Sequence, residues 1–198
     1  MTCAEGSIMF ADAEQLVRER LAASPLAELA GDELVVDLFC GAGGWTSLKT
    51  VRVDAAVNHS PLAISFHRAN NGHDGCEHHE GDAWRTPPRS VTRGRPVGLL
   101  LASAACTTHS RARGAAPIAK RVHMLGWCIA RWLKDESPRA FLVENVPEWQ
   151  DWGPAVAKVD ERGSPVLDAQ GRVQRTNCPR RKGAHFRKWL RYVKRLGY

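Results

Sequence analysis

The sequence lacks the features that mark membrane-spanning, secreted and zinc-ribbon proteins. No segment of its 198 residues approaches the ~20 consecutive apolar residues that a membrane span needs. Residues 1–10 lack the basic-then-apolar order of a secretory signal. The six cysteines include no C-x-x-C pair, and no internal repeat occurs. Together with a length typical of one domain, these absences predict a cytoplasmic globular protein.

One short segment does contain residue types that bind metals. It holds His73, Cys76, His78 and His79 within a stretch rich in Gly, Asn and Asp. No second pair of ligands follows at the spacing of a zinc site. We therefore favour a polar loop over a metal site and expect no metal.

Positive charge is concentrated in two regions, 111–121 and 175–195, and the net charge is +7. The second region interleaves its basic residues with His185, Phe186, Trp189 and Tyr192. Such clustering is typical of a surface that binds a polyanion. A solvated basic helix face explains the charge pattern equally well, and both interpretations stay open.

Apolar runs and helical periods alternate along the chain. Strands are expected at residues 34–39, 53–57, 97–102 and 139–144, with a further short strand ending near Asp82. Helices are expected at about 11–23 and 60–70, along a stripe from Ile118 to Trp132, and from Phe186 to Leu196. In the last helix the inward residues should be Phe186, Trp189, Leu190, Val193 and Leu196.

This alternation predicts an α/β fold, namely a doubly wound, mostly parallel sheet of Rossmann-like type. We expect an N-terminal helical segment at 1–31 and one domain at 32–198. Two turn signals within 155–182 indicate a hairpin or loop insertion.

Ligands of an open parallel sheet bind beyond the carboxyl ends of its strands, and three of the expected ends carry suggestive residues. The first strand runs into a glycine turn, Phe39–Gly44, whose backbone can close on a ligand. Asn58 and Asp82 follow the second and third strands and could accept hydrogen bonds from hydroxyl or amino groups. A plain tight turn and Asx turns are the alternatives.

Two further strand ends carry reactive groups. Cys106 lies in a small-residue loop after the fourth expected strand, with Arg111 and Arg113 nearby to favour a thiolate. Glu144 ends an otherwise apolar strand, where an acid is costly unless it is paired or functional. An inert buried thiol is the alternative for the cysteine.

These motifs occur in an order that resembles the DNA (cytosine-5) methyltransferase family. The resemblance rests on VVDLFCGAGG at 35–44, the Cys106 loop and Glu144-Asn145-Val146, and it runs from about residue 34 to residue 198. The segments at 57–70 and 144–154 are most similar to a phage-associated bacterial branch. The resemblance implies DNA methylation of the kind found in restriction-modification systems, with S-adenosylmethionine as cofactor.

Residue roles follow from the resemblance by position. Cys106 would attack carbon 6 of a cytosine flipped out of duplex DNA, Glu144 would bind the N3 edge of the base, and Asn145 would brace the cysteine loop. The cofactor would contact Phe39, Gly41, Gly43, Asn58 and Asp82. Phosphates near the target would contact Ser110, Arg111 and Arg113.

The sequence departs from the family pattern in three ways. Ala104 and Ala105 stand where the family has prolines before the nucleophile, which loosens the loop. The crossover at 45–52 is shorter than the dozen or so residues usual for a parallel crossover. The chain ends at Tyr198, before a sixth strand, an arginine-containing motif and a target-recognition region. We therefore expect a truncated, split or degenerate form, with a second polypeptide as a possible partner.

Three alternative functions remain open from the sequence. A catalytically impaired relative would bind DNA or cofactor without efficient turnover. A cytosine methyltransferase of this kind could act on transfer RNA, although the phage-type motifs argue against it. A basic nucleic-acid-binding module would leave the glycine turn, Cys106 and Glu144 as coincidences.

Overall fold

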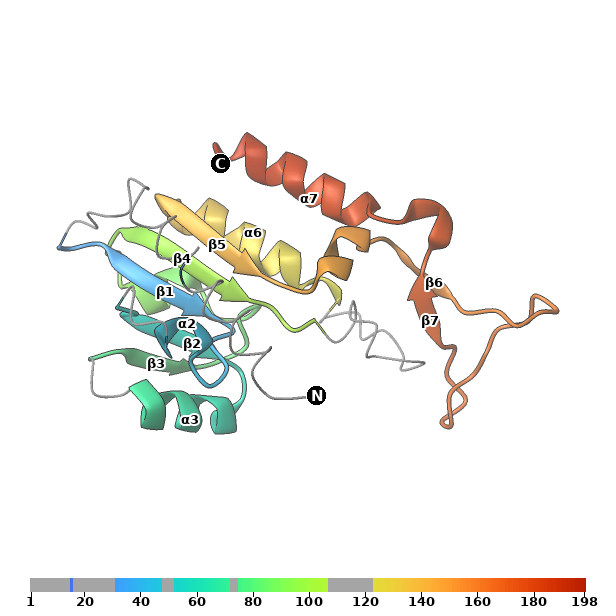
Figure 1. The fold of residues 1–198 in the computed structure, drawn as a ribbon, viewed down its shortest axis with the longest axis horizontal. Coiled ribbons are helices and arrows are strands. Elements are labelled where there is room, and N and C mark those ends of the chain that lie inside the picture. The colour runs from blue at the N-terminus through green and yellow to red at the C-terminus, as the bar shows by residue number, and fades with distance from the viewer. Residues whose placement is uncertain (1–14, 16–30, 48–51, 72–74, 107–122) are drawn as a thin grey trace. The chain divides into compact units, whose positions relative to one another are not determined.

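The computed structural model describes residues 15, 31–47, 52–71, 75–106 and 123–198 (Figure 1). These residues belong to two compact units. The first unit comprises residues 1–102 and 136–142, and the second comprises 103–135 and 143–198. The expected N-terminal helical segment lies outside the described residues except for Gln15, which is helical, and Gly31.

The sheet contains five strands in the order β3-β2-β1-β4-β5. Their bounds are β1 (Leu34–Leu38), β2 (Ala55–Asn58), β3 (Glu77–Glu80), β4 (Val97–Ser103) and β5 (Ala140–Glu144). β1 pairs in parallel with both β2 and β4, and β2 pairs in parallel with β3. The order reverses between β1 and β4, which is the hallmark of a doubly wound sheet. The predicted Rossmann-like α/β fold is confirmed.

The central strands are apolar because they are covered on both sides. All five residues of β1 are buried, as are the first six of β4. One core cluster joins Val35, Val53, Leu99 and Leu101 across three neighbouring segments. β3 lies at the edge of the sheet and has the sequence Glu-His-His-Glu, so its strand structure depends on pairing with β2.

Among the described residues of the first unit, three helices follow strands or turns: α2 (Gly44–Ser47), α3 (Pro61–Asn71) and α4 (Pro88–Thr92). α3 begins as the sequence indicates, since the Ser60 hydroxyl accepts a hydrogen bond from the Ala63 N–H (3.3 Å) and proline occupies the first helical position. α2 is a single turn, in keeping with the short crossover. None of the described helices combines the length and the hydropathy needed to cross a membrane.

The second unit is built around tryptophans. Its described residues include the helices α6 (Leu125–Glu136) and α7 (Ala184–Arg195) and the short 3-10 turns η4 (Pro147–Asp151) and η5 (Pro179–Arg181). Trp149 stacks on Trp152 with ring centroids 6.1 Å apart and meets Trp189 of α7 edge to face at 5.0 Å. The Trp189 indole N–H donates to the Gly126 carbonyl of α6 (2.7 Å). This aromatic cluster joins α6, η4 and α7.

The expectation for the faces of α7 is mostly right, with one error. Trp189 and Val193 are buried, whereas the Arg and Lys side chains are exposed. Leu190, expected to point inward, is 37% exposed, so that prediction is wrong. It follows Trp189 directly, so its side chain leaves the helix about 100° away from the buried indole.

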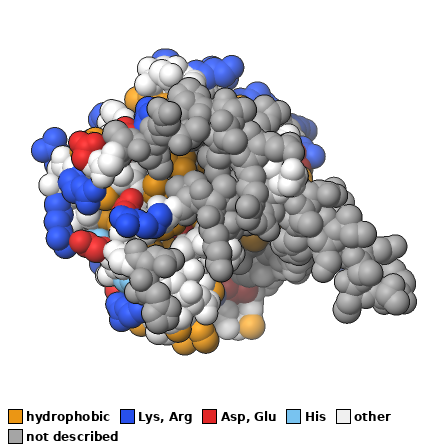
Figure 2. Space-filling view, turned by 60° about the vertical axis from the view of Figure 1, so that its left-hand side comes forward, with side chains coloured by type: hydrophobic (Ala, Val, Ile, Leu, Met, Phe, Trp, Pro, Cys, Tyr) orange, Lys and Arg blue, Asp and Glu red, His pale blue; other side chains and the backbone are white. Residues whose placement is uncertain are grey.

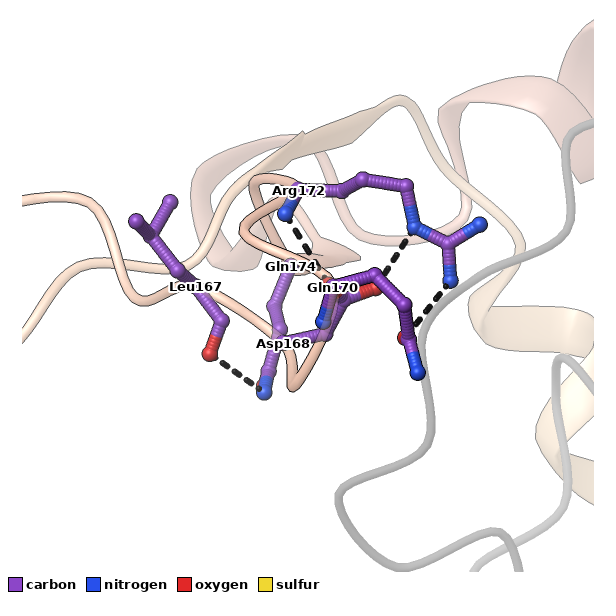
Figure 3. Close-up of polar contacts among 5 residues, drawn as sticks. All are labelled: Leu167, Asp168, Gln170, Arg172 and Gln174. Carbon is purple, nitrogen blue, oxygen red and sulfur yellow. Dashed lines mark hydrogen bonds and ion pairs between the residues drawn. The ribbon is translucent and has the colours of Figure 1, made fainter.

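Residues 155–177 form an antiparallel excursion between β6 (Ala155–Ala157) and β7 (Arg175–Asn177). Its two tips repeat one turn, in which an Asp carboxylate accepts backbone N–H groups and a glycine with positive φ follows three residues later. At the second tip Asp168 also accepts the Arg172 Nε–H at 2.8 Å (Figure 3). The backbone N–H of Arg172 is the main reason that the pKa of Asp168 lies below its usual value.

Candidate functional site

The carboxyl ends of the first unit's strands lie next to one another. Leu38 of β1 is in register with Ala102 of β4 and with Val57 of β2. Asn58 of β2 is in register with Glu80 of β3, and its carbonyl accepts the Gly81 N–H at 2.9 Å. The strand ends that lead to the glycine turn, to Asn58 and to Asp82 therefore form one edge.

The turn after β1 has a backbone that ordinary side chains rarely allow. φ is positive at Phe39 (61°), Gly41 (54°) and Gly43 (101°). A Cβ added at Gly43 would overlap the amide of Asn71 and lie 3.3 Å from the His67 ring, both on α3. The turn consequently packs directly on α3, and glycine is required at Gly43 for both conformation and space.

Asn58 and Asp82 both form the local turns that the sequence left as an alternative. The Asn58 side-chain oxygen accepts the Ser60 N–H at 3.0 Å, and one Asp82 oxygen accepts the Trp84 N–H at 2.9 Å. These bonds fix the two side chains at the edge of the sheet. Their contacts with a cofactor stay predictions.

Asp37 is a residue to which the sequence analysis gave no role. It lies in the middle of β1 with no exposed surface, and neither carboxylate oxygen has a hydrogen-bond partner among the described residues. Burial raises its pKa to about 8, so the carboxyl is largely protonated at neutral pH. The sequence signal for Asp37 was an acidic residue inside an apolar run that the sheet buries on both faces.

A cluster of ligand-type side chains lies between α3 and β3. His67 Nδ1 is 2.9 Å from His78 Nε2, and the Cys76 thiol lies within 4.8 Å of both histidine ligand atoms. His67 Nε2 is 3.1 Å from the Thr46 hydroxyl of α2. The sequence grouped Cys76 and His78 with His79, and it missed His67, which comes from a different element.

In the second unit the segments after β4 and β5 are joined directly. The Asn145 side-chain N–H donates to the carbonyl of Ala104 at 2.9 Å, and its oxygen accepts the Val146 N–H at 2.9 Å. Cys106 is a free, partly exposed thiol two residues after Ala104, and Glu144 is exposed. Asn145 therefore ties the Glu144 segment to the start of the cysteine loop.

The expected phosphate contacts Ser110, Arg111 and Arg113 lie outside the described residues, as does the basic region at 111–121. The second basic region is described, and its α7 residues Arg187, Lys188, Arg191 and Lys194 are exposed. Lys188 and Arg195 also lie over the Trp127 and Tyr192 rings, at 5.8 and 5.9 Å. Lys and Arg side chains are prominent on the described surface drawn in Figure 2.

A doubly wound parallel sheet with a glycine turn after its first strand defines a Rossmann-like domain of the kind that binds nucleotide-like ligands. The family model for C-5 cytosine-specific DNA methylases matches residues 34–152, more than half of the chain. The chain belongs to this family. A search of the curated proteins found no match.

Several solved structures are similar in fold. Streptomyces venezuelae DesVI is 17% identical, with a TM-score of 0.43, and the match covers 76% of this chain and 57% of that one. A Pyrococcus abyssi tRNA (uracil-54, C5)-methyltransferase is 13% identical with a TM-score of 0.41, covering 70% and 28%. A Clostridium acetobutylicum S-adenosylmethionine-dependent methyltransferase is 12% identical with a TM-score of 0.49, covering 91% and 78%. The chain thus spans little more than half of the first of these structures, and less than a third of the second.

Proposed function

We propose that this chain carries the catalytic machinery for methyl transfer from S-adenosylmethionine to carbon 5 of cytosine in DNA, with Cys106 as the nucleophile. The observation that carries the proposal is the hydrogen bond from Asn145 to the Ala104 carbonyl. It links the Glu144 segment to the cysteine loop, the two segments that the family resemblance assigns to the target base. A plain nucleic-acid-binding module gives no reason for that link.

The residues at the strand ends of the first unit fit a nucleoside cofactor. Three positive φ angles within Phe39–Gly43 turn the backbone so that it can approach a ligand closely. Asn58 and Asp82 stand on the adjoining ends of β2 and β3, where ribose and adenine groups need acceptors. S-adenosylmethionine, when bound, supplies the electrophilic methyl group.

The side chains of the second unit would act on the base. The Cys106 thiolate forms a bond to carbon 6, while Glu144 hydrogen-bonds the N3 edge and draws electron density from the ring. Carbon 5 then takes the methyl group, its proton leaves to a base, and the bond between sulfur and carbon 6 breaks. The flipped cytosine is required because carbon 6 is unreachable within the stack.

The proposal extends to duplex DNA as the partner, with phosphates held by Ser110, Arg111 and Arg113. It includes a second polypeptide that supplies further elements for target recognition. The motifs at 57–70 and 144–154 favour the phage-associated bacterial branch.

Covalent trapping on duplex DNA that contains 5-fluorocytosine tests the proposal, because fluorine at carbon 5 blocks release after attack and methyl transfer. Together with a candidate second polypeptide, the chain should form a complex stable to denaturation only when S-adenosylmethionine is present. Cys106→Ser should abolish it, and Glu144→Gln should slow it by about a hundredfold or more. Cys178→Ser, a change at another partly exposed free thiol of the second unit, is the matched control.

Trapping that survives Cys106→Ser would overturn the assignment of the nucleophile. Capture of a 5-fluorocytosine RNA in preference to the DNA duplex would show that the substrate is RNA and not DNA. Cofactor and DNA binding without any capture, also after addition of candidate second polypeptides, would favour the impaired relative, for which Ala104 and Ala105 give a reason.

A further inference from the structure

The cluster between α3 and β3 has the dimensions of a tetrahedral metal site. Zinc binds histidine nitrogen at about 2.0–2.1 Å and cysteine sulfur at about 2.3 Å, which places two nitrogen ligands ~3.3 Å and a nitrogen and a sulfur ~3.6 Å apart. His67 Nδ1 and His78 Nε2 are 2.9 Å apart, and the Cys76 sulfur is within 4.8 Å of both. Small side-chain movements suffice to surround an ion.

The ring nitrogen of His67 that does not face the cluster already has the kind of hydrogen-bond partner that metal-binding histidines have. A histidine that binds metal through one nitrogen normally donates its other N–H to an acceptor, which fixes the orientation of the ring. His67 points Nδ1 at the cluster and Nε2 at the Thr46 hydroxyl, 3.1 Å away. His67 has no exposed surface, so its ring is held in place.

Both imidazoles favour the neutral form, which is the form that binds metals. Burial lowers the pKa of His67, and the neighbouring His78 lowers it further. Burial also lowers the pKa of His78, with Arg68 as the next cause. His67 is buried and His78 is partly buried, and the two rings share one hydrogen bond.

A second thiol and a buried acid belong to the same region. Cys40 packs in an apolar cluster with Ala56 and Ile64, and Cys76 packs against that cluster. Asp37, Ala56 and His78 occupy one row across β1, β2 and β3, so their side chains share the face that α3 covers. The buried Asp37 carboxyl has no hydrogen-bond partner within the described part of the chain, and a nearby cation would stabilise its charged form.

We propose that His67, Cys76 and His78 bind a zinc ion, with water as the fourth ligand. The mixed sulfur and nitrogen ligands favour Zn²⁺ over Mg²⁺ or Ca²⁺, which prefer oxygen. This replaces the sequence-based expectation of a polar loop, because α3 supplies the ligand that the spacing lacked. The site lies behind the glycine turn, since Gly43 packs on His67, and the ion would fix that turn to α3 and β3.

The neighbouring histidine does not share the site. His79 follows His78 on β3 and therefore points to the opposite face of the sheet. It lies 3.6 Å from Glu77 and provides a control that changes the histidine content without touching the cluster.

Cobalt substitution tests the proposal on the full chain, without DNA or S-adenosylmethionine, so that its outcome is separate from that of the methyltransferase assay. Protein stripped with a chelator should bind one Co²⁺, with a thiolate charge-transfer band in the near ultraviolet and intense tetrahedral ligand-field bands, and Zn²⁺ should displace the cobalt. Competition with a chromophoric chelator then gives the Zn²⁺ affinity.

Cys76→Ser should remove the charge-transfer band, and His78→Gln should lower the Zn²⁺ affinity at least about a hundredfold, more than loss of an outer partner costs. His79→Gln should change neither result, and circular dichroism checks that each variant is folded. Absence of the band in the folded wild-type chain would overturn the proposal. So would a band and an affinity that persist in folded Cys76→Ser and His78→Gln.

Discussion

Asp37 shows how one side chain can make the stability of this protein depend on pH. Its carboxyl has a pKa of about 8 in the folded chain because burial penalises the charged form, against 3.8 for the free side chain. Between these values the folded state keeps a proton that the unfolded state has released. The free energy of unfolding should therefore fall as the pH rises from about 4 to about 8.

Asp37→Asn should remove this dependence, because an amide does not ionise. The stability of the wild type should decline relative to the variant by up to about 1.4 kcal/mol per pH unit across that range. Urea unfolding at pH 5, 6 and 7, followed by far-ultraviolet circular dichroism with a chelator present, measures the difference. Parallel pH profiles for the two proteins would show that the carboxyl is solvated or paired.

At the level of elements, the conformation and packing of the turn between β1 and α2 restrict which residues can occupy it. Gly43 combines a φ of 101° with close contact to Asn71 and His67 of α3. Gly43→Ala should lower the free energy of unfolding by about 1–2 kcal/mol from the backbone alone, with a further loss from the contact. S-adenosylmethionine binding should weaken in parallel.

Gly44→Ala is the matched control for that substitution. The next residue begins α2, and an added Cβ there would meet nothing within 4 Å. Alanine should leave stability unchanged or raise it by no more than about 1 kcal/mol, since it favours the helix. Thermal unfolding of both variants separates the turn geometry from a general effect of replacing glycine. Equal losses in the two would contradict the role given to Gly43.

The elements differ in how far the sequence could predict them. β1 and β4 follow from apolar runs, and α3 follows from its Ser-Pro start, because these signals are local. β3 is a strand only by pairing with β2, so its end at Glu80 falls before the expected Asp82. The inward face of α7 was overestimated at Leu190 because packing of large aromatic rings is not visible in the helical period.

Parts of the candidate site could likewise be predicted from the sequence, and other parts could not. The glycine turn and the strand-end positions of Asn58, Asp82, Cys106 and Glu144 could be read from order along the chain. The contact of His67 with His78 could not, because it joins the middle of a helix to an edge strand through tertiary packing. A histidine on the crossover helix, followed by another on the next strand, is the only sequence signal for it.

For the molecule as a whole, the excess of positive charge predicts how it should bind DNA. The affinity for DNA should depend little on the DNA sequence and should fall steeply as the salt concentration rises. Each phosphate neutralised contributes about 0.9 to the slope of log affinity against log salt concentration. Arg191→Ala with Lys194→Ala, two exposed changes on α7, should reduce that slope by up to about 1.8 without loss of stability.

Arg89→Ala is the control for the DNA measurement. Arg89 is exposed on α4, which precedes the amino end of β4, at the edge of the sheet opposite the strand ends described above. Fluorescence anisotropy at several salt concentrations should give this variant the wild-type slope. A slope reduced by up to about 0.9 in Arg89→Ala, half the change in the double variant, would mean that binding follows net charge and not the α7 face.

The tryptophan cluster has a spectroscopic consequence. Of the seven tryptophans, Trp45 and Trp84 belong to the first unit and the other five to the second. Emission excited in the indole band therefore reports mainly on the second unit, whereas the amide signal of circular dichroism reports on both. If the two units unfold separately, tryptophan emission and circular dichroism will give different midpoints of unfolding. If the protein unfolds in a single transition, the two midpoints will coincide. The protein thus contains its own pair of probes for deciding whether it unfolds in one step or in two.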